Sequence, residues 1–449
     1  MAELKRIVGK TYIGLLVCLL VFNMLILVSD KTDDLQVTYA YIEMLNTAEG
    51  VKSDSKLSTE AATIAWQEYF QKYEINGSDS SDKTAAAKQA REKLMQQAKY
   101  IDNYKGIIED KRQTAILYAT AGTYKKNSFE YNNLLKTQYD LSQIIDADVQ
   151  LSNGLWLEKL YKNNYIHLLT LITCVYTVYM FFSERKNGLY HIVHTGQSGR
   201  GVLFVKRSII LLIQAVVTNV ALYTESAVML LNRYDGVKDL NVAAVSDEYF
   251  ILTSGKLSRI QFLGLIILLS ILANVVLSLV LWAILLCFGN VNIGLFFYCC
   301  ICVADVVIYK VISAKSILQI FKYLNVYYLF FPNKAAEYFN WGCFNIAVSL
   351  LTTTIIVSVF IGILALFASA YISIRKYFTG KMNIVENAIE LILTYIMRLM
   401  VKTNNFGKEV YKILISQGII WILLLLAYIA ANVEPSYGVI YDAKKSYML

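Results

Sequence analysis

The sequence predicts an all-α integral membrane protein, with about six to seven transmembrane helices and a large helical extracellular domain between the first and the second. Three observations support this prediction. Hydrophobic residues make up 56% of the 449 residues and charged residues only 17%. The mean hydropathy of +0.46 lies outside the range of soluble globular proteins. Several apolar runs approach the roughly 20 residues that a helix needs to cross a bilayer.

The apolar runs give the order of the predicted spans and their orientation. They cover residues 12–28, 165–182, 208–231, 262–288, 292–311, 345–372 and 413–431. Because Lys and Arg are enriched in cytoplasmic flanks, the basic flanks place the N-terminus in the cytoplasm of a multi-pass cell-membrane protein. Those flanks are Lys5, Arg6 and Lys10 before the first span, Arg185, Lys186, Arg200, Lys206 and Arg207 after the second, and Arg375, Lys376 and Lys381 after the sixth.

The polar segments complete the expected domain organisation. Strong helix formers at helical spacing in 84–97 predict that the extracellular domain is helical. The connector 312–344 is rich in aromatic residues, so we expect it to anchor at the outer interface; the alternative is a surface for an exported peptide or lipid. The predicted order is 1–29 cytoplasmic N-terminus and first span, 30–164 extracellular domain, 165–374 transmembrane core with a cytoplasmic hairpin 183–207 and the outer connector 312–344, 375–412 cytoplasmic amphipathic segment, and 413–449 last span and outer tail.

The segment 383–400 has two interpretations. It is apolar at helical spacing but contains Glu386 and Glu390. A surface helix is expected rather than a span, because a span would bury two carboxylates in the bilayer.

The sequence contains no pattern that predicts catalysis. It lacks a nucleotide-binding phosphate loop, the HExxH zinc motif, the kinase motifs and the GxSxG nucleophile turn. No cofactor and no metal site are therefore expected, and His191 and His194 lack a third ligand nearby. The net charge of +8 is concentrated beside the spans, so no nucleic-acid partner is expected.

One charged group falls within a predicted span. Asp305 lies in the run 292–311, and ionisable groups in a membrane usually face a bundle interior or a partner. The hypothesis is that Asp305 lines a translocation path. Cys299, Cys300 and Cys302 in the same run point in different directions on a helix, so they are expected to pack rather than bind metal.

The stretch "SERKNGLYHIVHTGQSGRG" (183–201) separates two membrane-length runs. Its polar ends predict a short helix over 185–194, and its glycines predict a turn that returns the chain to the bilayer. A loop of this kind is accessible to a soluble protein. The alternative is that its basic residues only fix the orientation of the spans.

The order of residues in this loop resembles the cytoplasmic coupling element of permease subunits of the type-2 ABC transporter family, as found in Gram-positive exporters. The pattern runs from Glu184 and Gly188 to Thr195, then Gly199-Arg200, and ends with Lys206 at the start of the third span. The segments "NSFEYNNLLKTQYDLSQI" (127–144) and "AEYFNWG" (336–342) are also similar to that family, and the resemblance covers residues 1 to about 375.

This resemblance implies a function and partners. The chain is expected to be an export permease without its own ATPase site, moving a peptide, lipid or drug-like cargo. It is expected to pair with a second permease chain, homologous or identical, and with separate ABC ATPase subunits that bind ATP and Mg. The implied coupling residues are Glu184, Gly188, His191, Thr195, Arg200 and Lys206. The alternative function is a membrane sensor or scaffold whose extracellular domain binds a ligand.

Overall fold

The computed structural model describes residues 9–29, 35–51, 57–73, 82–182, 197–252, 255–288, 290–313, 318–375, 391, 394–395 and 419–431. In this part of the chain, five helices are long and apolar enough to cross a membrane, or six if one bent pair counts as a single span. By helix length and composition, the chain is therefore a candidate multi-pass membrane protein.

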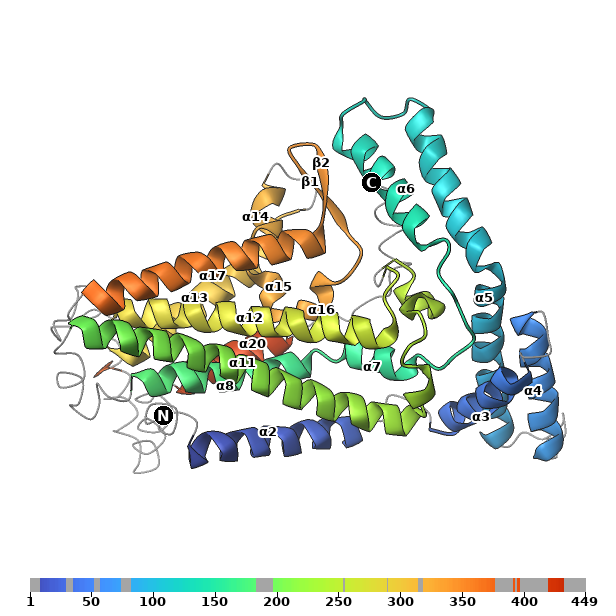
Figure 1. The fold of residues 1–449 in the computed structure, drawn as a ribbon, viewed down its shortest axis with the longest axis horizontal. Helices are drawn as coiled ribbons and strands as arrows, with labels where there is room; N and C mark the ends of the chain where they lie inside the picture. The colour runs from blue at the N-terminus through green and yellow to red at the C-terminus, as the bar shows by residue number, and fades with distance from the viewer. Residues whose placement is uncertain are drawn as a thin grey trace.

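The candidate spans lie side by side along the long axis of the molecule (Figure 1). They are α2 (Lys10–Ser29), α11 (Gln197–Tyr234), α12 (Arg259–Cys287), α13 (Val291–Val311) and α17 (Leu350–Arg375), together with the bent pair α7 (Leu155–Lys162) and α8 (Tyr165–Phe181). The axes of α7 and α8 differ by 47°. Successive candidate spans run in opposite directions, so the end of α8, the start of α11, the end of α12 and the start of α13 lie at the same end of the bundle (Figure 1).

Local sequence signals explain where α12 and α13 begin. Ser258 accepts a hydrogen bond from the Gln261 amide, and the Gln261 side chain accepts one from the Ser258 amide, which forms a capping box at the start of α12. The Asn290 side chain accepts a hydrogen bond from the Asn292 amide at the start of α13. These caps satisfy backbone donors that a helix end leaves free.

Small residues allow α17 to pack closely against α12. Ser358, Gly362, Ala365 and Ser369 are buried on one face of α17. A Cβ atom on Gly362 would lie only 3.2 Å from Cγ2 of Val276. This pattern of small residues at helical spacing is typical of helix pairs in membranes, where close backbone approach replaces the hydrophobic driving force.

Four helices form a separate layer at one end of the bundle (Figure 1). They are α3 (Leu35–Val51), α4 (Ser58–Lys72), α5 (Asp82–Thr120) and α6 (Phe129–Ile144), here called the α3–α6 unit. Its core is rich in alanine, including Ala48, Ala61, Ala65 and Ala90, each with 0% exposure. The helices predicted for 30–164 are therefore present, and the helix predicted at 84–97 is part of α5.

The connector differs from the all-helical prediction. Three short helices, α14 (Gln319–Tyr323), α15 (Tyr327–Phe330) and α16 (Pro332–Ala335), are followed by an antiparallel hairpin of β1 (Asn340–Cys343) and β2 (Ile346–Ser349). The sixth span was predicted to start at residue 345, which is wrong by five residues. Phe344 and Asn345 both adopt positive φ and reverse the chain, so 346–349 pairs with β1 and α17 begins only at Leu350.

The structure also differs from the hairpin predicted for 183–207, in the part of that segment that the structure describes. Residues 197–207 belong to α11, so the glycine-containing turn expected there is helical. Of the predicted seventh span, the structure describes α20 (Ile419–Ala431), which packs against α13 and α8. The helix expected at 185–194, the tail after residue 431 and most of 383–400 lie outside the described residues.

Candidate functional site

The predicted coupling residues are described only in part. Glu184, Gly188, His191 and Thr195 lie outside the described residues. Arg200 is half-buried and Lys206 is exposed, and both belong to the first turns of α11. The structure therefore places these two residues on a helix, at the end of the bundle that lies away from the α3–α6 unit (Figure 1).

The first turns of α11 are packed firmly onto two neighbouring helices. The Phe204 ring stacks on the indole of Trp282 in α12, with 5.1 Å between centroids and 19° between planes. Phe181 of α8 meets the same indole edge-on at 5.3 Å. The guanidinium of Arg207 lies 5.3 Å from the Phe181 ring centroid and is buried. This end of α11 is therefore in direct contact with both α8 and α12.

A chain of buried polar side chains runs between the spans. We call it the polar seam; its members are Tyr12, His167, Thr170, Thr173, Gln214, Thr218, Asn219, Ser270 and Asn274, all at most 3% exposed. Gln214 donates to Thr173 Oγ1 at 2.6 Å. The Tyr12 and Thr218 hydroxyls lie 2.8 Å apart. Such hydrogen bonds join α2, α8, α11 and α12 in surroundings where an unpaired polar group is costly.

His167 connects the polar seam to the connector. Its Nε2 lies 2.7 Å from the Leu329 carbonyl oxygen, and its Nδ1 lies 2.8 Å from Ser270 Oγ. A carbonyl oxygen only accepts hydrogen bonds, so Nε2 carries a proton. The Ser270 hydroxyl, which lies beside Nδ1, donates to Asn219 Oδ1 at 2.7 Å. The ring thereby joins α8, α12 and α15.

A buried ion pair at the start of α12 belongs to a set of contacts that reaches the α3–α6 unit. Arg259, with a fully buried side chain, lies 3.1 Å from Asp247 Oδ2 and donates to Ser152 Oγ at 2.9 Å. The Ser152 carbonyl accepts from Gln97 of α5 at 2.8 Å. A Cβ atom on Gly154 would lie 1.8 Å from Asp247 Oδ2, so this close approach requires glycine. We call this set of contacts the junction.

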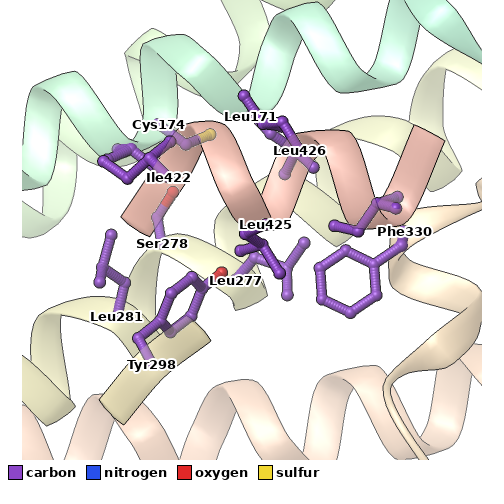
Figure 2. Close-up of a pocket in the computed structure, with 12 residues that line it drawn as sticks. Leu171, Cys174, Leu277, Ser278, Leu281, Tyr298, Phe330, Ile422, Leu425 and Leu426 are labelled. Atoms are coloured by element: carbon purple, nitrogen blue, oxygen red, sulfur yellow. The ribbon is translucent and has the colours of Figure 1, made fainter. Parts of the chain in front are cut away.

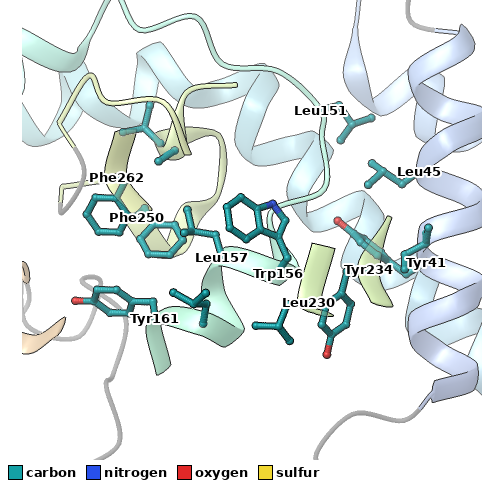
Figure 3. Close-up of a cluster of buried hydrophobic side chains, with 14 of the residues drawn as sticks. Tyr41, Leu45, Leu151, Trp156, Leu157, Tyr161, Leu230, Tyr234, Phe250 and Phe262 are labelled. Atoms are coloured by element: carbon teal, nitrogen blue, oxygen red, sulfur yellow. The ribbon is translucent and has the colours of Figure 1, made fainter. Parts of the chain in front are cut away.

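Apolar packing surrounds the junction. Figure 3 shows Trp156 of α7 between Tyr234 of α11 and the aromatic group of Phe250 and Phe262. The Phe250 and Phe262 ring centroids lie 5.2 Å apart. A Cβ atom on Gly236 would lie 2.4 Å from the Trp156 ring. Tyr41 and Leu45 of α3 belong to the same buried cluster, so the α3–α6 unit is joined to the end of α11 and the start of α12 by both polar and apolar contacts.

Two carboxyl groups at or near the junction have raised pKa values. Burial raises the pKa of Asp247 to about 6, although the Arg259 guanidinium acts in the opposite direction. Burial, and then repulsion by Asp239, raise the pKa of Glu49 to about 7. Both shifts favour the protonated form of the carboxyl group in the folded protein.

Asp305 lies where α13 meets the connector. Its Oδ1 accepts a hydrogen bond from the Val326 amide at 3.3 Å. Nearby, the Tyr309 and Tyr327 rings stack with 3.7 Å between centroids, and Lys322 Nζ lies 4.7 Å from the Tyr309 centroid. Asp305 thus contacts the connector at one end of the bundle and is not a member of the polar seam.

A small apolar cavity lies beneath α20. Figure 2 shows Leu425 and Leu426 of α20 beside Leu171, Cys174 and Ser278. The cavity has a volume of about 20 Å³, which is the space of about one water molecule. In this arrangement α20 therefore fills the space between α8, α12 and α13.

The polar seam and the junction were missed by the sequence analysis. The available signals were Gln214, Asn219 and Asn274 inside apolar runs and Arg259 just before one, but their partners are distant in sequence.

Among the described residues, no group of three or more His, Cys, Asp or Glu side chains is arranged to hold a metal ion. No known family model, no curated protein and no solved structure matches the chain.

Proposed function

We propose that the chain is the membrane permease subunit of an ATP-driven ABC exporter. In this proposal it moves a peptide, lipid or drug-like cargo outward across the cell membrane by alternating access. Separate ATPase subunits, which bind ATP and Mg, supply the energy, and a second permease chain completes the pathway. The α3–α6 unit is extracellular, and the N-terminus and residues 183–196 are cytoplasmic.

The observation that carries the proposal is the path of α11. This helix runs without a break from Gln197 to Tyr234, a length of about 57 Å at 1.5 Å per residue. Its first turns hold Arg200 and Lys206, directly after the loop that resembles a coupling element. Directly after its last turn, Asp235 accepts a hydrogen bond from Asn46 of α3 at 3.2 Å, which brings the end of α11 to the α3–α6 unit.

The mechanism follows from this rigid path. An ATPase that closes on ATP pushes the loop and the start of α11, and the Phe204–Trp282 stack passes the displacement to α12. Because packed helices move as units rather than bending continuously, the bundle rocks between inward-open and outward-open arrangements. The polar seam stabilises one of these arrangements, since its hydrogen bonds join four spans.

The test is the ATPase activity of the purified complex. Native-membrane purification of the chain should recover an ATP-binding protein, and Arg200→Glu should lower the stimulation of its ATPase without lowering membrane insertion. Val202, an exposed residue half a turn away, provides the control as Val202→Ala. Unchanged stimulation in Arg200→Glu, or the absence of any nucleotide-hydrolysing partner, would contradict the proposal.

A second candidate function is a membrane sensor or scaffold. The junction favours it, because Arg259 of α12 donates to Ser152, which in turn accepts from Gln97 of α5. This link between the α3–α6 unit and a span suits the transfer of a signal from a bound ligand. Recovery of a histidine kinase in place of an ATPase would support this alternative.

A further inference from the structure

Five large apolar side chains are exposed at the end of the bundle that carries the α3–α6 unit. Three lie in or beside α14 and two at the β1–β2 hairpin. They are Leu318 (53% exposed), Phe321 (62%), Leu324 (44%), Phe344 (84%) and Ile346 (65%). We call this set the hairpin patch.

The backbone at the tip of the hairpin is unusual. Phe344 has φ +47° and Asn345 has φ +69°, and Cys343 pairs with Ile346 on either side of them. Two-residue turns of this kind favour Asn and Gly, because a large side chain is sterically disfavoured at positive φ. Asn345 fits this preference and Phe344 does not. The turn therefore holds a large ring outward in a conformation that the residue disfavours.

The hairpin patch continues the apolar surface of the spans. In Figure 1, α14 lies beside the first turns of α17, and the hairpin projects sideways from the same end. α14 contacts both α13 and α17. Val311 at the end of α13 is 77% exposed, and Ile356 in α17 is 61% exposed. The patch thus continues the exposed apolar surface of α13 and α17.

We propose that the hairpin patch is embedded in the bilayer leaflet on the side of the α3–α6 unit. Lipid covers the patch at the boundary between headgroups and acyl chains. Aromatic rings and short amphipathic helices favour this depth. The opposite face of α14 holds it in place, because Tyr323 stacks on Trp341 of β1 with 5.3 Å between ring centroids.

The lipid contact braces the α3–α6 unit at a second point. The Asn132 side chain of α6 donates to the Asn345 carbonyl at 2.8 Å. The Tyr338 hydroxyl donates to Asp140 of α6 at 2.8 Å. A Cβ atom on Gly342 would lie 3.0 Å from the Phe129 ring. The hairpin thus lies between the bilayer and α6, and the Arg259–Asp247 junction holds the other end of the unit.

Photocrosslinking of the full chain in lipid vesicles tests this assignment. Phe344 is replaced by p-benzoylphenylalanine, and the protein is reconstituted with radiolabelled phosphatidylglycerol and phosphatidylethanolamine. Tyr139 of α6 is the matched control, because it is an aromatic residue of the α3–α6 unit with 64% exposure. A probe at Phe321 provides a second position within the patch.

The expected result is at least fivefold more labelled lipid on the probes at 344 and 321 than on the probe at 139. Equal labelling at 344 and 139 would overturn the proposal. An adduct of doubled mass at 344 would show that a second copy covers the patch, and an adduct with a peptide would show cargo binding; either would overturn it as well. The result does not depend on whether the chain transports anything.

Discussion

Arg259 Nη2 lies 3.1 Å from Asp247 Oδ2, and the Arg259 side chain is fully buried. The pair joins the start of α12 to the loop beneath the α3–α6 unit, and through Ser152 and Gln97 it reaches α5. A buried pair of this kind is sensitive to the loss of one partner, since the other charge is left without compensation.

Arg259→Ala should therefore destabilise the protein by about 3–5 kcal/mol. The loss is measured as a fall in the midpoint of thermal unfolding in detergent. The control is Lys162→Ala, which removes the partly exposed pair with Glu158 in α7, and such pairs contribute about 1 kcal/mol or less. Equal effects of the two substitutions would contradict the role assigned to the junction.

Replacing each of two glycines by alanine should change the stability of the protein in opposite directions. A Cβ atom at 154 meets Asp247 at 1.8 Å, so Gly154→Ala should destabilise by about 1–3 kcal/mol. Gly106 is exposed within α5 and has no atom within 4 Å of the added Cβ, so Gly106→Ala should stabilise by about 0.5–1 kcal/mol. Thermal unfolding of both variants is the measurement. A stable Gly154→Ala protein would mean that the loop moves freely.

The folded protein should lose stability as pH rises, because two carboxyl groups at or near the junction have raised pKa values. The pKa values of Glu49, about 7, and Asp247, about 6, lie above their ordinary values. A raised pKa in the folded state contributes stability that is complete below the ordinary value and is lost as pH rises through the folded value. Between pH 4.5 and 7, Glu49 should account for a loss of about 1–2 kcal/mol, reduced by solvent screening.

Glu49→Gln separates this effect from other titrations. The variant should unfold at a higher temperature than the parent at pH 8 and show a smaller change between pH 5 and pH 8. If the parent instead became more stable from pH 5 to pH 8 and Glu49→Gln did not alter that trend, the environment assigned to Glu49 would be wrong.

The contact between α11 and α12 should govern energy coupling. Phe204→Ala removes the ring that stacks on Trp282. Under the proposed function, stimulation of the partner ATPase should fall by about fivefold or more, which corresponds to a typical coupling free energy. Val205→Ala is the matched control because Val205 is the next residue in α11 and is 53% exposed. Equal stimulation in the two variants would show that the stack does not transmit motion.

Four of the predicted runs, 12–28, 165–182, 262–288 and 292–311, match helices to within three residues at each end, because length and hydropathy are local properties. The first predicted span, 12–28, coincides with α2 to within two residues at its start. The β1–β2 hairpin was not predicted, since Phe344 is a poor signal for a turn with positive φ. The polar seam was not predicted either, because His167 and Ser270 are 103 residues apart and only the packing of α8 on α12 brings them together.

Asp305→Asn tests whether the carboxylate acts in transport or only in packing. The asparagine oxygen can still accept the Val326 amide hydrogen bond that Asp305 Oδ1 accepts at 3.3 Å, so the contact between α13 and the connector should persist. Assembly and the unfolding temperature should stay close to those of the parent, while export in reconstituted vesicles should be abolished because the charge is lost. Asp305→Ala is the companion variant, since it removes both the charge and the hydrogen bond and should also lower the unfolding temperature. Normal export by Asp305→Asn would show that Asp305 has only a structural role, in the contact between α13 and the connector.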